Sequence, residues 1–117
     1  MRKKILLVED EKDLRGLYGE ELKEEGYEVV PAKNGDEALQ KLEKEHPDLV
    51  LMDIVMPVLD GIQTLSMIKA KDRAIPVILH SAHLQFQLDP KAQAANGFVR
   101  KTSDLKDLKS KIQEFLS

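Results

Sequence analysis

The sequence DLVLMD at residues 48–53 contains four consecutive apolar residues and ends in an acid. An apolar run without alternation is typical of a central strand in a parallel sheet, because both faces of such a strand are buried. Shorter apolar runs at residues 5–8, 77–79 and 98–99 also lead into polar residues. The carboxyl ends of parallel strands meet at one edge of the sheet, so we expect these polar residues to lie together.

Strand-like and helix-like segments alternate along the chain. Apolar patterns predict strands at residues 5–8, 27–30, 48–53, 76–79 and 98–100, with the second strand closed by Pro31. Five helices are predicted: residues 11–25, residues 34–46, a segment marked by Ile62, Leu65 and Ile68, a short helix between Asp89-Pro90 and Gly97, and a last helix capped by Ser103 or Asp104. This alternation predicts a doubly wound α/β fold with strand order 2-1-3-4-5.

The composition limits what the protein can be. Its 117 residues suit one domain, which we take as residues 1–117, and they carry a net charge of -3. Basic residues are spread along the chain, so we expect no direct contact with nucleic acid. The sequence has no cysteine, no apolar run of the ~20 residues that span a bilayer, and no signal-length apolar stretch after its basic start. We expect a cytoplasmic monomer without membrane contact.

The polar residues at the predicted strand ends form a candidate site. They are Glu9, Asp10, Asp53, Ser81 and Lys101. Three carboxylates held close together repel one another and favour a bound cation. Mg²⁺, or Mn²⁺ in its place, prefers oxygen ligands. We expect Asp10 and Asp53 to bind the cation directly and Glu9 to bind it directly or through a water. With a hydroxyl and an ammonium nearby, the site also suits a phosphoryl group.

Several short segments, in this order, resemble the receiver domain of two-component response regulators, in particular single-domain chemotaxis regulators. They are Val8-Glu9-Asp10-Glu11, the sequence LMDIVMP at residues 51–57 with Asp60-Gly61, Ser81-Ala82, and Phe98 three residues before Lys101. The resemblance covers nearly the whole chain and implies a flavodoxin-like, five-stranded sheet with helices on two faces. It implies a phosphoacceptor signalling module rather than an enzyme that turns over an external substrate.

The resemblance also implies a role for each residue. Asp53 would be the phosphoacceptor that takes a phosphoryl group from a phosphohistidine in a Mg²⁺-dependent reaction, assisted by Lys101 and Ser81. The backbone carbonyl of Val55 would join the metal ligands. Ser81 and Phe98 would switch the surface that is offered to a partner. The implied partners are a sensor histidine kinase or a histidine phosphotransfer protein, and a downstream protein effector.

Two features depart from the family pattern. Thr102 follows Lys101 where the family usually has proline, which leaves the position of the Lys101 ammonium open. The segment between Ser81 and Lys101 is shorter than the resemblance leads us to expect. We therefore expect a short or mobile helix within residues 83–96.

Two other functions stay open. A phosphatase with an aspartyl-phosphate intermediate typically carries a second acid two residues after its nucleophile, but Val55 stands there. A degenerate receiver would bind partners without phosphorylation. Singly, each residue has an ordinary explanation, such as a helix cap for Asp10 or a surface lysine for Lys101. The given sequence ends at Ser117 without an effector domain, so we expect output through a partner protein, and the alternative is a receiver that belongs to a larger regulator.

Overall fold

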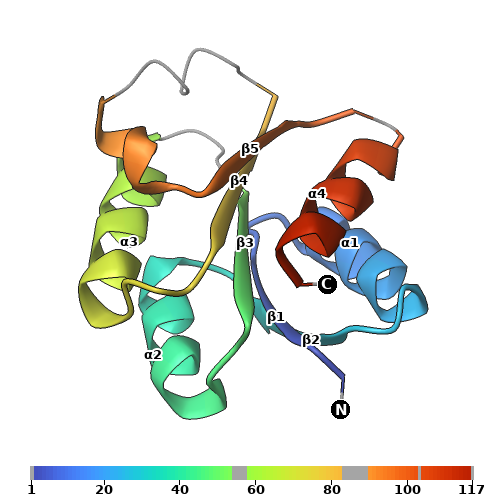
Figure 1. Ribbon diagram of the computed structural model, residues 1–117, viewed down its shortest axis with the longest axis horizontal. Coiled ribbons are helices and arrows are strands. Elements are labelled where there is room, and N and C mark those ends of the chain that lie inside the picture. The colour runs from blue at the N-terminus through green and yellow to red at the C-terminus, as the bar shows by residue number, and fades with distance from the viewer. Residues whose placement is uncertain (1, 54–57, 83–89, 103, 117) are drawn as a thin grey trace.

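The computed structural model describes residues 2–53, 58–82, 90–102 and 104–116. Its five parallel strands lie in the order β2-β1-β3-β4-β5, which confirms the predicted doubly wound fold. The strands are β1 (Lys4–Val8), β2 (Glu28–Ala32), β3 (Leu49–Asp53), β4 (Val77–Ser81) and β5 (Gly97–Arg100). The described helices are α1 (Lys12–Glu24), α2 (Gly35–Glu45), α3 (Val58–Lys71), α4 (Lys106–Leu116) and the 3-10 helix η2 (Pro90–Ala94). Helices α2 and α3, with η2, cover one face of the sheet, and α1 and α4 cover the other (Figure 1).

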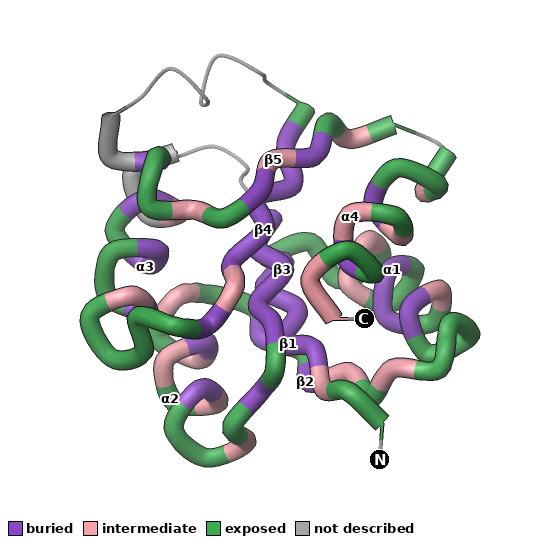
Figure 2. The backbone as a smooth tube through the Cα atoms, in the orientation of Figure 1, coloured by how far each residue is buried: buried purple, intermediate pink, exposed green. Residues whose placement is uncertain are grey.

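The core consists of two apolar layers, one on each face of the sheet, and the central strands are buried between them (Figure 2). Side chains alternate between the two faces along each strand. In β3, Met52 packs toward α2 and α3, and Leu51 packs toward α1 and α4. Asp53 is the next residue in the row of Leu51, so the alternation directs its side chain toward α1 and α4.

The prediction of five α-helices is wrong by one in the described part of the chain, which holds four α-helices and the short 3-10 helix η2. The helix predicted between Asp89-Pro90 and Gly97 is the one that differs, and residues 83–89 lie outside the described residues. Asn96 supplies the physical reason. Its backbone N–H donates to Val77 O at 2.8 Å, and its Oδ1 accepts from Val77 N at 3.0 Å. These bonds fix the chain beside β4 directly after η2, which favours a tight 3-10 turn.

Pro31 does not close β2, contrary to the prediction, because the strand continues to Ala32. β2 lies at the edge of the sheet, and Pro31 pairs in register with Leu7 of β1. An edge strand tolerates proline because one side of its backbone needs no donor for a neighbouring strand. The apolar pattern therefore locates this strand but places its end too early.

The described helix starts show which residues act as caps. Asn34 caps α2 as predicted, since its Oδ1 accepts from Glu37 N at 2.8 Å. Asp104 Oδ1 accepts from Lys106 N at 2.9 Å before α4, whereas Ser103 lies outside the described residues. α1 has Glu11 at its N-cap, without a side-chain cap bond. The ordinary explanation of Asp10 as a helix cap is therefore wrong, and its carboxylate is available to the site.

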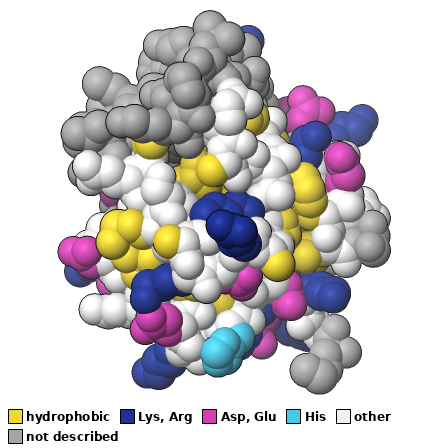
Figure 3. Space-filling model, turned by 60° about the vertical axis from the view of Figure 1, so that its left-hand side comes forward, with side chains coloured by type: hydrophobic (Ala, Val, Ile, Leu, Met, Phe, Trp, Pro, Cys, Tyr) yellow, Lys and Arg dark blue, Asp and Glu magenta, His cyan; other side chains and the backbone are white. Residues whose placement is uncertain are grey.

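Acidic and basic side chains lie beside one another on the face that Figure 3 brings forward. Such a mixture matches a chain whose net charge is only -3. Within the described ranges, none of the helices combines the length and the apolar character that crossing a membrane requires.

Helices α2 and α3 approach each other closely at Gly35, the first residue of α2. A Cβ atom at this position would overlap the hydroxyl of Thr64 in α3. Thr64 is itself buried, so it has little room to give way. Gly35 and Thr64 line a pocket of about 370 Å³ together with Asp10 and Asp53, so this contact also shapes the approach to the acids.

We predict that Gly35→Ala lowers the free energy of unfolding by about 1–3 kcal/mol, because it overpacks the contact with Thr64. Gly16→Ala in α1 is the matched control, since a Cβ there meets nothing within 4 Å. Helix propensity should make that control more stable by up to about 1 kcal/mol. Urea unfolding measures both changes. Gly35→Ala should cost less in a Thr64→Ala background, and an unchanged cost there would contradict the overlap.

Candidate functional site

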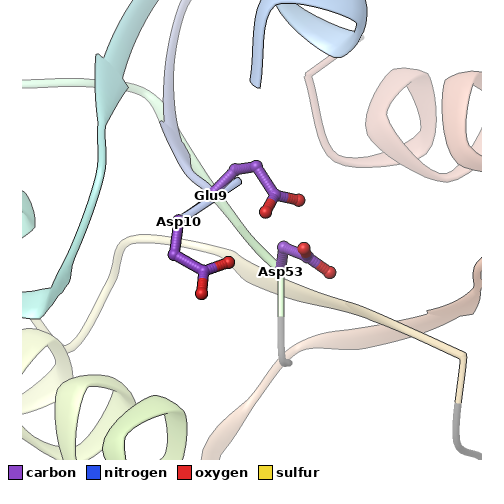
Figure 4. Close-up of side chains that lie close together, drawn as sticks. All are labelled: Glu9, Asp10 and Asp53. Atoms are coloured by element: carbon purple, nitrogen blue, oxygen red, sulfur yellow. The ribbon is translucent and has the colours of Figure 1, made fainter. Parts of the chain in front are cut away.

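The parallel register of β1 and β3 brings Glu9 and Asp53 together. Val8 in β1 pairs in register with Met52 in β3, and Glu9 and Asp53 are the residues that follow them. Glu9 and Asp53 therefore stand side by side at the carboxyl edge of the sheet, and Asp10 follows in the loop before α1 (Figure 4). Each of the three acids offers one oxygen, and these oxygens all lie within 4.8 Å of one another. The structure thus brings together the three carboxylates that the sequence singles out.

Lys101 supplies positive charge at this edge. Its backbone N–H donates to the Ser81 carbonyl at 2.7 Å, which continues the pairing of β4 with β5 by one residue. Its Nζ forms ion pairs with Asp53 and, at 3.6 Å, with Glu9 Oε1. The Lys101 side chain is 16% exposed, so the charge is largely withdrawn from water. Lys101 thus reaches the acids although Thr102 replaces the usual proline.

The two strand-end acids are strongly desolvated. Glu9 is fully buried and Asp53 is 9% exposed. Across the described ranges, the Lys101 ammonium is the partner of Glu9 Oε1 and of Asp53 Oδ1, and Asp53 Oδ2 has no hydrogen-bond donor. Burial, reinforced by the neighbouring Asp53 carboxyl, raises the pKa of Glu9 to about 8. The Glu11 N–H, which donates to Glu9 Oε2 at 2.9 Å, and the Lys101 ammonium offset this rise only in part.

The charges act on Lys101 in the opposite direction. Burial alone lowers the pKa of the ammonium, but the ion pair with Asp53 and the charge of Glu9 outweigh burial, so the pKa of Lys101 is raised. Lys101 therefore stays charged throughout the physiological range. The site in this form holds one cation against three acids, and Glu9 keeps its proton up to about pH 8.

These observations fit a divalent cation. Mg²⁺ prefers carboxylate oxygens, and in the described part of the protein Asp53 Oδ2 has no donor and Glu9 Oε1 has only the 3.6 Å ion pair with Lys101. Asp10 is exposed, so the cluster is open to solvent on one side. A cation among these acids would replace repulsion by attraction and displace the proton of Glu9. The backbone carbonyl of Val55, which the resemblance adds to the ligands, lies outside the described residues.

Ser81 and Phe98 lie toward the other face of the sheet. Phe98 pairs in register with Leu79, and both pack into the layer under α2 and α3. Ser81 follows Leu79 by two residues and so shares its row. Ser81 is buried and Phe98 is half-buried. Their common row would let a movement of Ser81 change the space that Phe98 can occupy, and their switching role stays a prediction.

His80 is a buried residue beside the acids. It pairs in register with Asp53 and is 1% exposed. Its ring meets that of Tyr18 in α1 edge-on, with the ring centroids 5.2 Å apart. Burial lowers the pKa of His80 to about 4, so the ring is neutral near neutral pH. His80 therefore adds no charge beside Asp53 near neutral pH.

Arg15 of α1 contacts the loop that carries Glu9 and Asp10. Its Nη1 donates to the Glu9 carbonyl at 2.9 Å and to the Asp10 carbonyl at 3.4 Å. Sequence reasoning misses this residue, because apolar spacing assigns Arg15 to the wet face of an amphipathic helix. A contact to backbone carbonyls gives no signal in the sequence that could have pointed to it.

Comparison with known sequences gives consistent matches. The sequence model of one family, described as the response regulator receiver domain, matches residues 5–113. Sporulation initiation phosphotransferase F of Bacillus subtilis is 35% identical over 118 residues, which cover 99% of this chain and 95% of that protein. Chemotaxis protein CheY of Halobacterium salinarum is 36% identical over 119 residues, which cover 100% of this chain and 99% of that protein.

Solved structures match over the same length. Response regulator protein TrrA from Thermotoga maritima, in complex with Mg²⁺-BeF, gives a TM-score of 0.91 at 39% identity and covers 97% of this chain and 98% of its own. TrrA in complex with histidine kinase ThkA gives a TM-score of 0.89 at 40% identity, with 98% and 99% of the two chains covered. The likeness therefore extends over the whole sheet and both helical layers.

We predict that the metal-free protein becomes less stable as the pH rises from about 4.5 to about 8. Glu9 keeps its proton in the folded protein up to about pH 8 but loses it near pH 4.5 in the unfolded chain. The folded state therefore binds more protons in this window, and stability falls with rising pH. Glu9→Gln has no such proton to lose, so its stability should fall less steeply. Urea unfolding in EDTA across this window measures the slopes.

Glu24→Gln is the control for this prediction, because Glu24 is an exposed acid at the end of α1. It should reproduce the wild-type slope. Parallel slopes for the wild type and Glu9→Gln would show that Glu9 titrates as an ordinary acid.

Proposed function

The chain belongs to the response regulator receiver domain family, and from this premise we propose that Asp53 is the residue that accepts a phosphoryl group. The observation that carries the proposal is the position of Asp53 at the end of a fully buried strand, paired with Lys101. An acid costs stability at such a position unless a partner compensates for it. The neighbouring Glu9 and Asp10 add the charge that a metal ion requires. Members of this family act as phosphoacceptor modules in two-component signalling.

The proposed reaction uses Asp53 as a nucleophile toward a phosphohistidine. A carboxylate oxygen attacks phosphorus, a P–O bond forms as the P–N bond breaks, and the imidazole leaves with the electron pair of that bond. Phosphoryl transfer depends mainly on positioning and on neutralising the transferring oxygens. Lys101 already lies against Asp53 and would transfer its ion pair to the phosphoryl group. Ser81 would donate its hydroxyl hydrogen to a phosphoryl oxygen.

Glu9, Asp10 and Asp53 are the residues proposed to hold Mg²⁺, or Mn²⁺ in its place. When bound, the cation supplies positive charge to the transferring oxygens. The related regulator TrrA has been solved with Mg²⁺-BeF, in which BeF stands for the phosphoryl group. The same residues would later orient water for hydrolysis, which restores the free carboxylate of Asp53.

Ser81 and Phe98 are proposed to convert phosphorylation into a change of surface. A phosphoryl group on Asp53 would attract the Ser81 hydroxyl and draw it away from its resting place. Phe98, which packs in the same layer, would move into the space that Ser81 leaves. This is a two-state element that a local charge biases. The surface that changes would be formed by η2, β5 and α4.

The phosphoryl donor is proposed to be a sensor histidine kinase or a histidine phosphotransfer protein, and the receiver of the signal a downstream protein. The complex of the related TrrA with histidine kinase ThkA supports this class of donor. We infer no turnover of an external substrate, because Val55 stands where aspartyl-phosphate phosphatases carry a second acid. We also propose that the protein is cytoplasmic and monomeric, with residues 1–117 forming one domain.

We predict that incubation with Mg²⁺ and acetyl phosphate adds the mass of one phosphoryl group, and that Asp53→Asn abolishes this gain. Asp48→Asn is the matched control, because Asp48 directly precedes the strand that Asp53 ends and is exposed at the other edge of the sheet. Intact-protein mass spectrometry should show the wild-type gain in the control. Omission of Mg²⁺ should reduce the gain strongly in both.

Two results would contradict this proposal in different ways. A gain that persists in Asp53→Asn would place the phosphoacceptor elsewhere in the chain. A wild-type protein that gains no mass with Mg²⁺ would favour a degenerate receiver that binds partners without phosphorylation.

A further inference from the structure

We propose that Arg15 is a positioning residue of the metal site, which holds the loop of Glu9 and Asp10 in the form that binds Mg²⁺. The inference rests on the proposed function in so far as that function requires the cation. Arg15 itself offers no metal ligand, since a guanidinium has donors and no acceptor. Its effect would therefore act through the backbone of the two acids.

The loop needs such support because it places like charges together. Asp10 is exposed, and its carboxylate accepts no hydrogen bond from the described residues, so its position depends on the backbone. Glu9 and Asp53 lie within reach of the same ion, and Glu9 loses its proton when a cation binds, so the metal-bound form gathers three like charges on this loop and the end of β3. The N-cap residue of α1, Glu11, makes no side-chain cap bond that would fix the helix entry. Lys101 and the Glu11 N–H hold the Glu9 side chain, whereas Arg15 holds the backbone carbonyls of the loop.

Arg15 completes a clamp on Glu9. The N–H of Glu9 donates to Ala32 O at 2.9 Å, and the Glu9 carbonyl accepts from Arg15 Nη1 at 2.9 Å. Both peptide groups that flank the Glu9 side chain are thus hydrogen-bonded. The second contact, 3.4 Å from Nη1 to the Asp10 carbonyl, extends the hold to the next acid. Arg15 can act as an anchor because its own N–H donates to Glu11 O at 2.9 Å within the first turn of α1.

The charge of Arg15 and its hydrogen bonds have opposite effects on a cation. A guanidinium is charged at every relevant pH, so its charge alone disfavours a second cation nearby. Its charge-assisted bonds to the two carbonyls favour the cation by holding the ligands in place. Partners that orient metal ligands typically contribute about 10- to 100-fold in metal affinity. Removal of Arg15 should therefore weaken Mg²⁺ binding, whereas removal of a charge alone should not.

The test compares Arg15→Met and Arg15→Lys with the control Lys12→Met. Lys12 begins α1, is exposed, and has no described contact with the loop, so Lys12→Met removes the same charge from the same turn. Isothermal titration calorimetry measures the Mg²⁺ dissociation constant of each protein. Urea unfolding with EDTA and with saturating Mg²⁺ measures the stabilisation that the metal adds. Hydrogen exchange of the Glu11 amide in EDTA reports the loop without any metal.

We expect Arg15→Met to bind Mg²⁺ about tenfold more weakly or worse, Arg15→Lys to lie between it and the wild type, and Lys12→Met to bind at least as tightly as the wild type. The Glu11 amide should exchange faster in Arg15→Met than in Lys12→Met. Equal or tighter Mg²⁺ binding by Arg15→Met would overturn the role of Arg15 while leaving the proposed function intact. A wild-type protein that binds no Mg²⁺ would overturn the proposed function as well.

Discussion

The buried ion pair between Asp53 and Lys101 is the constraint on which the rest of the structure depends. β3 is buried along its whole length, so the carboxylate at its end requires a positive partner. Removal of one partner from a buried ion pair typically costs about 3–5 kcal/mol. Lys101 comes from the far end of the chain, and the order β1-β3-β4-β5 brings it to Asp53. The strand order of the sheet therefore also determines which charges meet at its carboxyl edge.

Glu9 adds a second buried acid to the Asp53–Lys101 ion pair, so the site favours the binding of further positive charge. Lys101 balances one carboxylate, and the second buried acid is left to hold a proton, as its pKa of about 8 shows. A divalent cation and a phosphoryl group bring opposite charges, so together they satisfy the acids and Lys101 better than either alone. The excess of acids over positive charge lowers the stability of the metal-free protein, and the same excess favours the form that holds a cation and a phosphoryl group. Stability and function are coupled through the charge of this edge.

Apolar runs and their polar ends are enough to predict a parallel sheet and the meeting of the acids at its carboxyl ends, because burial and parallel topology determine both. The errors arise where tertiary contacts decide. Pro31 stays within β2 because that strand lies at an edge. The tight turn of η2 depends on the bonds of Asn96 to β4, which local patterning does not reveal. The role of Arg15 cannot be predicted from the sequence, because it binds backbone carbonyls, which every residue has.

Thr102 shows how the position of the site survives a departure from the family pattern. The residue after Lys101 is not what fixes Lys101, because its backbone N–H is bonded to Ser81 O at 2.7 Å as an extension of the sheet. Thr102 Oγ1 donates to Asp104 O at 2.6 Å, which ties the following turn to the approach to α4. The sheet therefore positions the ammonium, and the turn after it has freedom to vary. This division explains how the charge pairing persists although Thr102 replaces proline.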